Sequence, residues 1–301
     1  MTHSTFSGTG VAIITPFDPQ GKPDHAAIRH LVGYLAENGV DVIVVLGTTG
    51  ESVTLFEDEQ KAVIQTVVEA NAGRCTIMVG IGGNHTAALE QKIARTDFAG
   101  IDGILSVSPY YNKPVQEGIV RHYEVLSSVA PIPLMLYNVP GRTGSNMSID
   151  TTLRIAHDCK NVVGIKEASG NMEQIMTIMR DRPKEFLMIS GDDALTLPIL
   201  ASGGDGAISV TANAFPQLYS AMVRFAMEGH TERALPIHTA LLEFTRLMFA
   251  DGSPGGIKAA LKVLGMCNEY VRLPLVNVRP DIYKAIEQEV HKLNQFKAHL
   301  D

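Results

Sequence analysis

One lysine stands at the end of an apolar run, where its type and position suit chemistry on a carbonyl group. The run is VVGIKE, residues 162–167, whereas lysines such as Lys61 and Lys92 lie among polar residues. Lys166 is therefore the one lysine that we expect to be desolvated. Removal from water favours the neutral amine, and a neutral amine attacks a carbonyl carbon to form a Schiff base. A structural lysine paired with an acid, here Glu167, is the alternative, and this residue alone leaves both open.

A glycine-rich turn follows another apolar run and could bind a small carboxylate. Its sequence is GTTGE, residues 47–51. The glycines permit tight turns, while adjacent hydroxyl and amide groups can donate hydrogen bonds to an anion. The segment lacks the lysine of a GxxxxGK[ST] motif, so a nucleotide P-loop is not expected. A capped turn without a ligand remains the alternative.

Tyrosine and arginine follow two further apolar runs. The segments are SPYYNKP, residues 108–114, and YNVPGRTG, residues 137–144. A tyrosine hydroxyl can carry a proton, and a planar guanidinium that is always charged suits a carboxylate. Together these residue types predict an acidic keto substrate. Each segment on its own would more often serve packing or lie on the surface.

Eight short apolar runs carry these segments, and their number predicts the fold. They lie near residues 10–15, 41–46, 76–81, 103–108, 133–138, 162–168, 186–190 and 206–210. Between consecutive runs, the chain is long enough to form a helix. Eight such units favour an α/β fold of the (β/α)₈ TIM-barrel type over a doubly wound sheet, which usually has five or six strands. Active sites of such barrels lie at the carboxyl ends of the strands, where the segments above fall.

Helices are predicted between the runs and after them. Apolar residues at 28, 31, 32 and 35 have helical spacing, with Asp24 placed to cap the helix and Gly39 to end it. Thr54 and Glu57 have capping-box spacing before a helix that continues to about Ala72. Three helices are expected near 231–250, 256–265 and 280–298. We expect a catalytic barrel over residues 1–230 and a C-terminal helical region over 231–301.

Composition excludes several classes of protein and partner. Hydrophobic residues make up 45% and charged residues 19% of the chain, which is typical of a folded globular protein. With 25 Lys and Arg against 32 Asp and Glu, the net charge is −7, and nucleic acid is not an expected partner. The three cysteines are far apart, and the ten histidines form no metal-binding motif, so no metal is expected. Without a signal peptide or a membrane span, a soluble, cytoplasmic protein is expected.

Four segments, taken in order and spacing, resemble the dihydrodipicolinate synthase family over nearly the whole chain. They are GTTGE at 47–51, YYNKP at 110–114, YNVPGRTG at 137–144 and GIKE at 164–167. The first is shared loosely across pyruvate-dependent class I aldolases, including N-acetylneuraminate lyase and keto-deoxy sugar acid aldolases. The double tyrosine and Arg142 narrow the resemblance to the synthases.

The resemblance implies an activity and a role for each site residue. Lys166 would form a Schiff base with pyruvate, and the product with L-aspartate 4-semialdehyde would be 4-hydroxy-tetrahydrodipicolinate, the first committed intermediate of lysine and diaminopimelate biosynthesis. Neither a metal nor an organic cofactor is implied. The other implied roles are a proton relay of Thr48, Tyr137 and Tyr111, with Tyr111 from a neighbouring subunit; pyruvate carboxylate binding by Thr49; a lining backbone carbonyl at Ile208; and binding of the semialdehyde carboxylate by Arg142. A homotetramer, built as a dimer of dimers, is also implied.

One departure from the family concerns feedback by lysine. The positions that match the inhibitor pocket of lysine-inhibited members are Ser52, Asn84 and Tyr110. Glu57 and Gln60 stand where histidines are usual, and Ala88 stands where a glutamate is usual. Without that carboxylate we expect weak or absent inhibition. Two other functions stay open: an aldolase for sugar-derived keto acids, and a non-catalytic sensor that binds keto acids.

Overall fold

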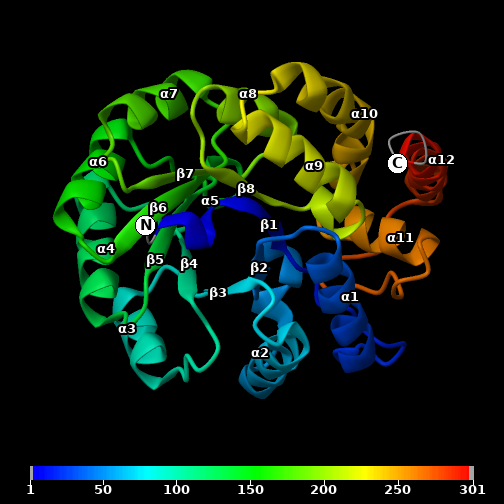
Figure 1. Ribbon diagram of the computed structural model, residues 1–301. Helices are drawn as coiled ribbons and strands as arrows, with labels where there is room; N and C mark the ends of the chain where they lie inside the picture. The colour runs from blue at the N-terminus through cyan, green and yellow to red at the C-terminus, as the bar shows by residue number, and fades with distance from the viewer. Residues whose placement is uncertain (1–2, 298–301) are drawn as a thin grey trace.

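Eight parallel strands close into a barrel in the computed structural model, which describes residues 3–297 (Figure 1). Each strand pairs with its neighbours in chain order, and β8 pairs with β1. The strands are β1 Gly8–Ala12, β2 Val42–Val45, β3 Thr76–Gly80, β4 Gly103–Val107, β5 Leu134–Asn138, β6 Val162–Glu167, β7 Leu187–Ser190 and β8 Gly206–Ser209. The predicted (β/α)₈ barrel is confirmed.

Helices surround the barrel and continue beyond its last strand (Figure 1). Those between or directly after the strands are α1 His25–Glu37, α2 Glu57–Asn71, α3 Thr86–Arg95, α4 Gln116–Val129, α5 Pro140–Thr143, α6 Ile149–Asp158, α7 Met172–Asp181, α8 Thr196–Ala201 and α9 Pro216–Met227. Short 3₁₀ turns follow several strands, among them η2 Thr48–Gly50, η3 Ser52–Thr54, η4 Asp193–Leu195 and η5 Thr211–Asn213.

Two apolar cores hold the barrel together because successive strand residues point to opposite faces. The larger core lies between the strands and the helices, where α1 buries Ile28 and Leu31 against the outer face of the barrel. The smaller core fills the barrel interior with residues such as Val44, Leu105 and Ile189. The interior is therefore packed, and a site can open only at an end of the barrel.

A capping residue explains the start of α1, whereas the cap predicted for α2 is at the wrong residues. The Asp24 carboxylate accepts a hydrogen bond from Ala27 N at 3.0 Å, so the predicted cap is confirmed. The predicted capping box of Thr54 and Glu57 is wrong. The residue that accepts is Glu59, whose Oε2 accepts from Phe56 N at 2.9 Å, while Thr54 belongs to the preceding 3₁₀ turn.

The first strand lies earlier in the chain than its apolar run. It covers Gly8–Ala12, while the predicted run extends to residue 15. Ile14 N donates to the Asn213 side chain at 3.3 Å, and Thr15 Oγ1 donates to Gly50 O at 2.7 Å. The apolar residues after Ala12 are therefore buried by loops at the carboxyl end of the barrel, and burial alone did not mark the end of the strand.

Three helices form the C-terminal region, as predicted. They are α10 Thr231–Phe249, α11 Gly255–Val263 and α12 Pro280–Lys297, and α12 packs against the other two (Figure 1). Residue 298 of the third predicted helix, like the rest of 298–301, lies outside the described residues. The division at residue 230 stays a prediction. Within residues 3–297 no helix combines the length and apolar character that crossing a membrane requires.

Candidate active site

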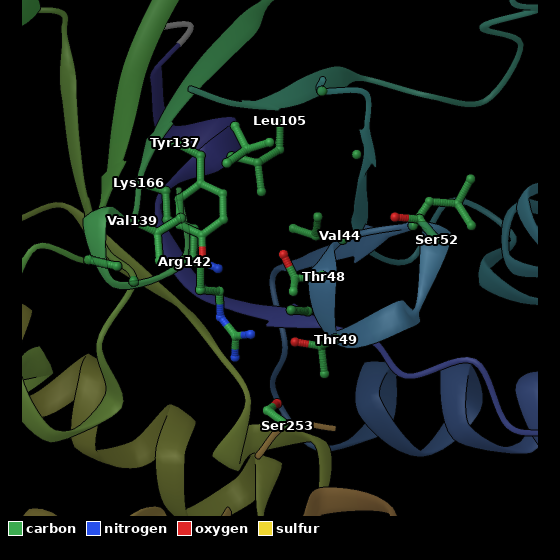
Figure 2. A pocket seen from close by; sticks show the side chains of 18 of the residues that line it. Val44, Thr48, Thr49, Ser52, Leu105, Tyr137, Val139, Arg142, Lys166 and Ser253 are labelled. Atoms are coloured by element: carbon green, nitrogen blue, oxygen red, sulfur yellow. The ribbon is translucent and has the colours of Figure 1, made fainter. Parts of the chain in front are cut away.

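A cavity of about 800 Å³ opens at the carboxyl ends of the strands (Figure 2). It brings together five of the seven residues singled out from the sequence, which are Thr48, Thr49, Tyr137, Arg142 and Lys166. Tyr137 lies in β5 and Lys166 in β6, while the other three lie in the turns that follow β2 and β5. The shared end of a parallel barrel is what unites positions so distant in the sequence.

Lys166 lies in the wall of this cavity and is almost completely shielded from solvent. Its β6 position is in register with Tyr137 of β5 and Ile189 of β7, and only 5% of its surface is exposed. The ammonium position is 4.5 Å from the centre of the Tyr137 ring. Burial lowers the pKa of Lys166 to about 8, with the Asp193 carboxylate opposing that shift and Arg142 adding to it. The amine is thus poised to lose its proton close to neutral pH.

Glu167, the alternative partner of this lysine, faces away from it. Its carboxylate accepts hydrogen bonds from Asn138 Nδ2 at 3.0 Å, Gln174 Nε2 at 3.2 Å and Ser169 N at 2.7 Å. Burial raises the pKa of Glu167, and these hydrogen bonds oppose the rise. Because neighbouring strand residues point to opposite faces, Glu167 belongs to a polar network outside the barrel wall. The structural ion pair with Lys166 is not observed.

Hydroxyl groups lie on both sides of the cavity. Tyr137 is 9% exposed, and burial raises its pKa to about 12 against the influence of Arg142. Thr48 and Thr49 belong to η2, where Gly50 N donates to Gly47 O at 3.0 Å and closes the turn. Thr49 is buried and Thr48 is exposed to the cavity, across which it faces Tyr137 (Figure 2). A phenol that stays protonated can donate a hydrogen bond or pass on a proton.

Arg142 supplies a positive charge at the mouth of the cavity. It lies on the single-turn helix α5, where Arg142 N donates to Val139 O at 2.9 Å. Its side chain is exposed and extends toward Thr49 and Ser253 (Figure 2). An exposed guanidinium at this position suits a carboxylate on an incoming substrate.

Two of the seven predicted residues are not in this cavity. Tyr111 is 88% exposed and has a left-handed backbone with φ of 70°, whereas its neighbour Tyr110 lines the cavity. Ile208 is 3% exposed and belongs to the apolar interior of the barrel, while Val210 lines the cavity. The roles implied for both residues stay predictions.

Some cavity residues were missed from the sequence. The segment Gly191 to Asp193 follows β7, and Asp193 is 7% exposed. Asp193 Oδ2 accepts from Val210 N at 3.0 Å and from Thr211 N at 2.9 Å, which fixes this carboxylate. The signal was present, since GDD directly follows a predicted strand. Ser253, from the turn before α11, also lines the cavity, and no pattern in the sequence indicates that contact.

The expectation that Lys166 alone is desolvated is wrong. Lys258 of α11 is 0% exposed, and its Nζ donates to Glu51 Oε1 at 2.5 Å. Its helix looks amphipathic in sequence, and its partner lies 207 residues earlier in the chain. Local sequence therefore carried no sign of this burial.

The barrel and its dry lysine define a class, that of Schiff-base-forming (β/α)₈ enzymes. Residues 5–293 match the sequence profile described as the Dihydrodipicolinate synthetase family, and the chain belongs to that family. It is 45% identical over 290 residues to a 4-hydroxy-tetrahydrodipicolinate synthase of Flavobacterium psychrophilum, covering 96% of this chain and 99% of the relative. It is 47% identical over 296 residues to the Porphyromonas gingivalis protein of the same name, covering 98% and 100%.

Solved structures agree. Dihydrodipicolinate synthase from Aquifex aeolicus superposes with a TM-score of 0.92 at 39% identity, covering 96% of this chain and 98% of that one. A structure described as the first monomeric dihydrodipicolinate synthase variant has a TM-score of 0.93 at 37% identity, covering 96% and 97%. The family, the barrel and the synthase activity expected from the sequence are confirmed. Subunit number is not settled by family membership.

Proposed function

We propose that this chain condenses pyruvate with L-aspartate 4-semialdehyde on Lys166 and releases 4-hydroxy-tetrahydrodipicolinate. The observation that carries the proposal is the burial of Lys166, with a pKa of about 8, in a cavity that also presents Arg142. At pH 7 about one such amine in ten is neutral, against roughly one in 3,000 for an ordinary lysine. The barrel thereby raises the reactive fraction on the order of 300-fold.

In the first step, Nζ of Lys166 bonds to the keto carbon of pyruvate, and the keto oxygen leaves as water. We assign Thr49 the binding of the pyruvate carboxylate, because it lines the same cavity as Lys166. Tyr137 and Thr48 face each other across the cavity, and we assign them the transfer of the protons that this step requires. Each hydroxyl is a poor acid alone, so a relay lowers the barrier by sharing the proton among positioned groups.

In the second step, the protonated imine acts as an electron sink. A proton leaves the pyruvate methyl group, and the resulting enamine carbon bonds to the aldehyde carbon of the semialdehyde. Arg142 binds the carboxylate of this second substrate and so directs the aldehyde toward the enamine. The substrate amine then attacks the imine carbon, closes the ring and expels the Lys166 amine. Lys166 is thereby regenerated.

A second copy of this chain is part of the proposal. The turns after β2 and β4 expose Val53 by 86%, Tyr111 by 88% and Val115 by 76%. Apolar side chains exposed to this degree near one opening favour coverage by another molecule. We propose that a tight dimer brings Tyr111 to the partner's relay and that two dimers form a tetramer.

The three cysteines are free thiols, which supports a reducing, cytoplasmic setting.

Trapping with borohydride tests the chemistry on Lys166. Pyruvate and borohydride should add the mass of a reduced adduct to the peptide that contains Lys166. A chain that serves only as a sensor would give no adduct. A coupled assay with pyruvate and aspartate semialdehyde should show turnover, and a chain that instead turned over only sugar-derived keto acids would refute the proposed substrate.

Arg142→Ala separates the two substrates. It should abolish use of the semialdehyde while pyruvate trapping persists, because the guanidinium serves the second substrate. Arg142→Lys is the matched control: it keeps the charge but loses the two-pronged geometry, so it should retain only part of the activity. Equal loss of trapping in both variants would contradict this assignment.

Complementation tests the dimer. Tyr111→Phe and Lys166→Met should each be nearly inactive alone. After mixing and subunit exchange, a hybrid dimer contains one site with both Lys166 and the partner's Tyr111, so activity should return. Sedimentation in the same buffer would give the subunit number. Mixed dimers that stay inactive would refute the shared site.

A further inference from the structure

A second buried lysine lies beneath the turn that carries the two threonines. Lys258 Nζ donates to Glu51 Oε1 at 2.5 Å and to Tyr270 O at 2.8 Å, and both charged side chains are fully buried. The same nitrogen is 4.1 Å from the centre of the buried Phe17 ring. Burial lowers the pKa of Lys258, and the Glu51 carboxylate opposes that change. The Lys258–Glu51 pair is thus closed to solvent. Neither residue lines the cavity.

Glu51 directly follows the Thr48–Gly50 turn and has an unfavourable backbone. Its φ of 52° and ψ of 35° are left-handed, a conformation that brings the Cβ of any residue except glycine too close to the backbone. Glu51 N donates to Thr48 O at 3.1 Å, and Glu51 O accepts from Thr54 N at 3.0 Å. Its carboxylate must therefore hold a residue whose own backbone would prefer another conformation, and the turn beginning at Thr48 depends on it.

A neighbouring arginine completes the attachment to the C-terminal region. Arg272 N donates to Glu51 Oε2 at 3.0 Å, so both carboxylate oxygens are bound by residues that follow the barrel. The Arg272 guanidinium also donates to both carboxylate oxygens of Glu59 at 2.6 Å and to Thr54 O at 2.7 Å. The segment from Thr48 to Glu59 is thereby attached to the C-terminal region at two points, Lys258 of α11 and Arg272 of the segment between α11 and α12.

We propose that Lys258 is a positioning residue for the reaction, acting through Glu51 to hold Thr48 and Thr49 at their places in the cavity. The inference rests on the proposed function, because it assigns the threonines to the proton relay and to the pyruvate carboxylate. Two charges buried together are seldom more stabilising than two apolar groups of similar size. The contribution of the pair is orientation. Each hydrogen bond holds the Glu51 side chain, and hence the turn that begins at Thr48, in one position. The C-terminal region is then required for chemistry as well as for covering the barrel.

Three variants separate positioning from stability. Glu51→Gln keeps the shape but removes one charge. Lys258→Met removes the other and leaves the buried Glu51 carboxylate without its charged partner, bound only by Arg272 N. The double variant removes both charges. Removing one charge of a buried pair destabilises the folded protein, whereas removing both charges restores its stability. The double variant should therefore unfold near the wild-type temperature. Its kcat should still fall on the order of 10- to 100-fold, as expected for misplacement of a catalytic group by up to about 1 Å.

Two further readouts distinguish this from a general loss of structure. The KM for pyruvate should rise in the double variant because Thr49 is displaced. Borohydride trapping at saturating pyruvate should still reach completion with an unchanged pH profile because Lys166 is not touched. The control is Arg182→Met, which breaks the Arg182–Asp205 ion pair next to the start of β8, at the opposite end of the barrel. It should lower the unfolding temperature and leave kcat and KM unchanged.

The outcomes are separable from those that test the proposed function. Absence of condensation by the wild-type protein would refute the function. If the wild-type protein turns over its substrates and the double variant has the same kcat and KM, the positioning role alone is refuted. A double variant that fails to fold would also overturn it, since the pair would then be needed by the whole barrel rather than by the turn.

Discussion

A single methyl group added beside Lys166 should slow imine formation without changing the chemistry available to the site. Gly191 follows β7, and a Cβ built there would lie 2.9 Å from both Cγ and Cε of Lys166 and 3.0 Å from Cβ of Ala168. Ordinary carbon contacts lie at about 3.5 Å or more, so the lysine stem must move by roughly 0.6 Å. The backbone cannot readily yield, because Gly191 N donates to Glu167 O at 2.8 Å.

The magnitude follows from the sensitivity of reactions to geometry. A misplacement of about 1 Å can cost on the order of 100-fold in rate, so a shift of this size in Gly191→Ala should cost roughly tenfold or more. Overpacking of a filled site costs about 1–3 kcal/mol of folding stability in addition. The side chain of Lys166 has little room to escape, since it is 5% exposed and packs beside Tyr137.

The assay is the rate of trapping by borohydride as a function of pyruvate concentration. Gly191→Ala should lower the rate of imine formation, while the peptide that is labelled stays the same. Gly33→Ala is the matched control, because a Cβ at this position in α1 would meet no atom within 4 Å. It should leave the rate unchanged. A wild-type trapping rate in a folded Gly191→Ala protein would refute the reasoning that close packing sets the position of the amine.

Three further predictions concern charge. Between pH 6 and pH 7, kcat/KM for pyruvate should rise about tenfold, reach about half of its maximum near pH 8 and level off above about pH 9, because the neutral form of Lys166 is the nucleophile and its pKa is about 8; a steep rise continuing to pH 10 would contradict this. L-Lysine should inhibit weakly or not at all, because Ala88 supplies no carboxylate and Lys92, bound to Gln60 Oε1 at 3.0 Å, adds a cation to the same side of the cavity. Half-inhibition below about a millimolar, within the usual range of enzyme ligands, would count against it. Lys166→Met should raise the thermal midpoint at pH 7, which calorimetry would measure, and a lower midpoint would show that burial does not penalise this lysine.

The barrel and most of the cavity were predictable because both depend on short-range patterns. Apolar runs of strand length recurred eight times, and the residues after them share one end of the structure once the strands are parallel. Lys166 could be singled out because the four apolar or glycine residues before it, 162–165, are local information. Asp193 follows the same rule, because its GDD segment comes directly after the seventh apolar run.

What could not be predicted depends on contacts between distant segments. Lys258 lies on a helix whose sequence resembles that of a half-exposed one, and its burial is set by Glu51 and Phe17 from the barrel. The end of β1 was misplaced because loops bury Ile13 and Ile14 as completely as a strand would. Tyr111 is exposed in one chain, so its role concerns a second molecule.

The stability and the reactivity of this site depend on the same lysine in opposite ways. The unfolded chain binds a proton at Lys166 with an ordinary pKa, and the folded chain binds it with a pKa lowered to about 8. Between these two values the unfolded state holds more protons, so the contribution of Lys166 to stability improves as pH rises through that window. At pH 7, below both values, the full penalty applies, on the order of 3 kcal/mol. The barrel must therefore be stable enough without Lys166 to tolerate it, and the extensive apolar cores on both sides of the wall supply that stability.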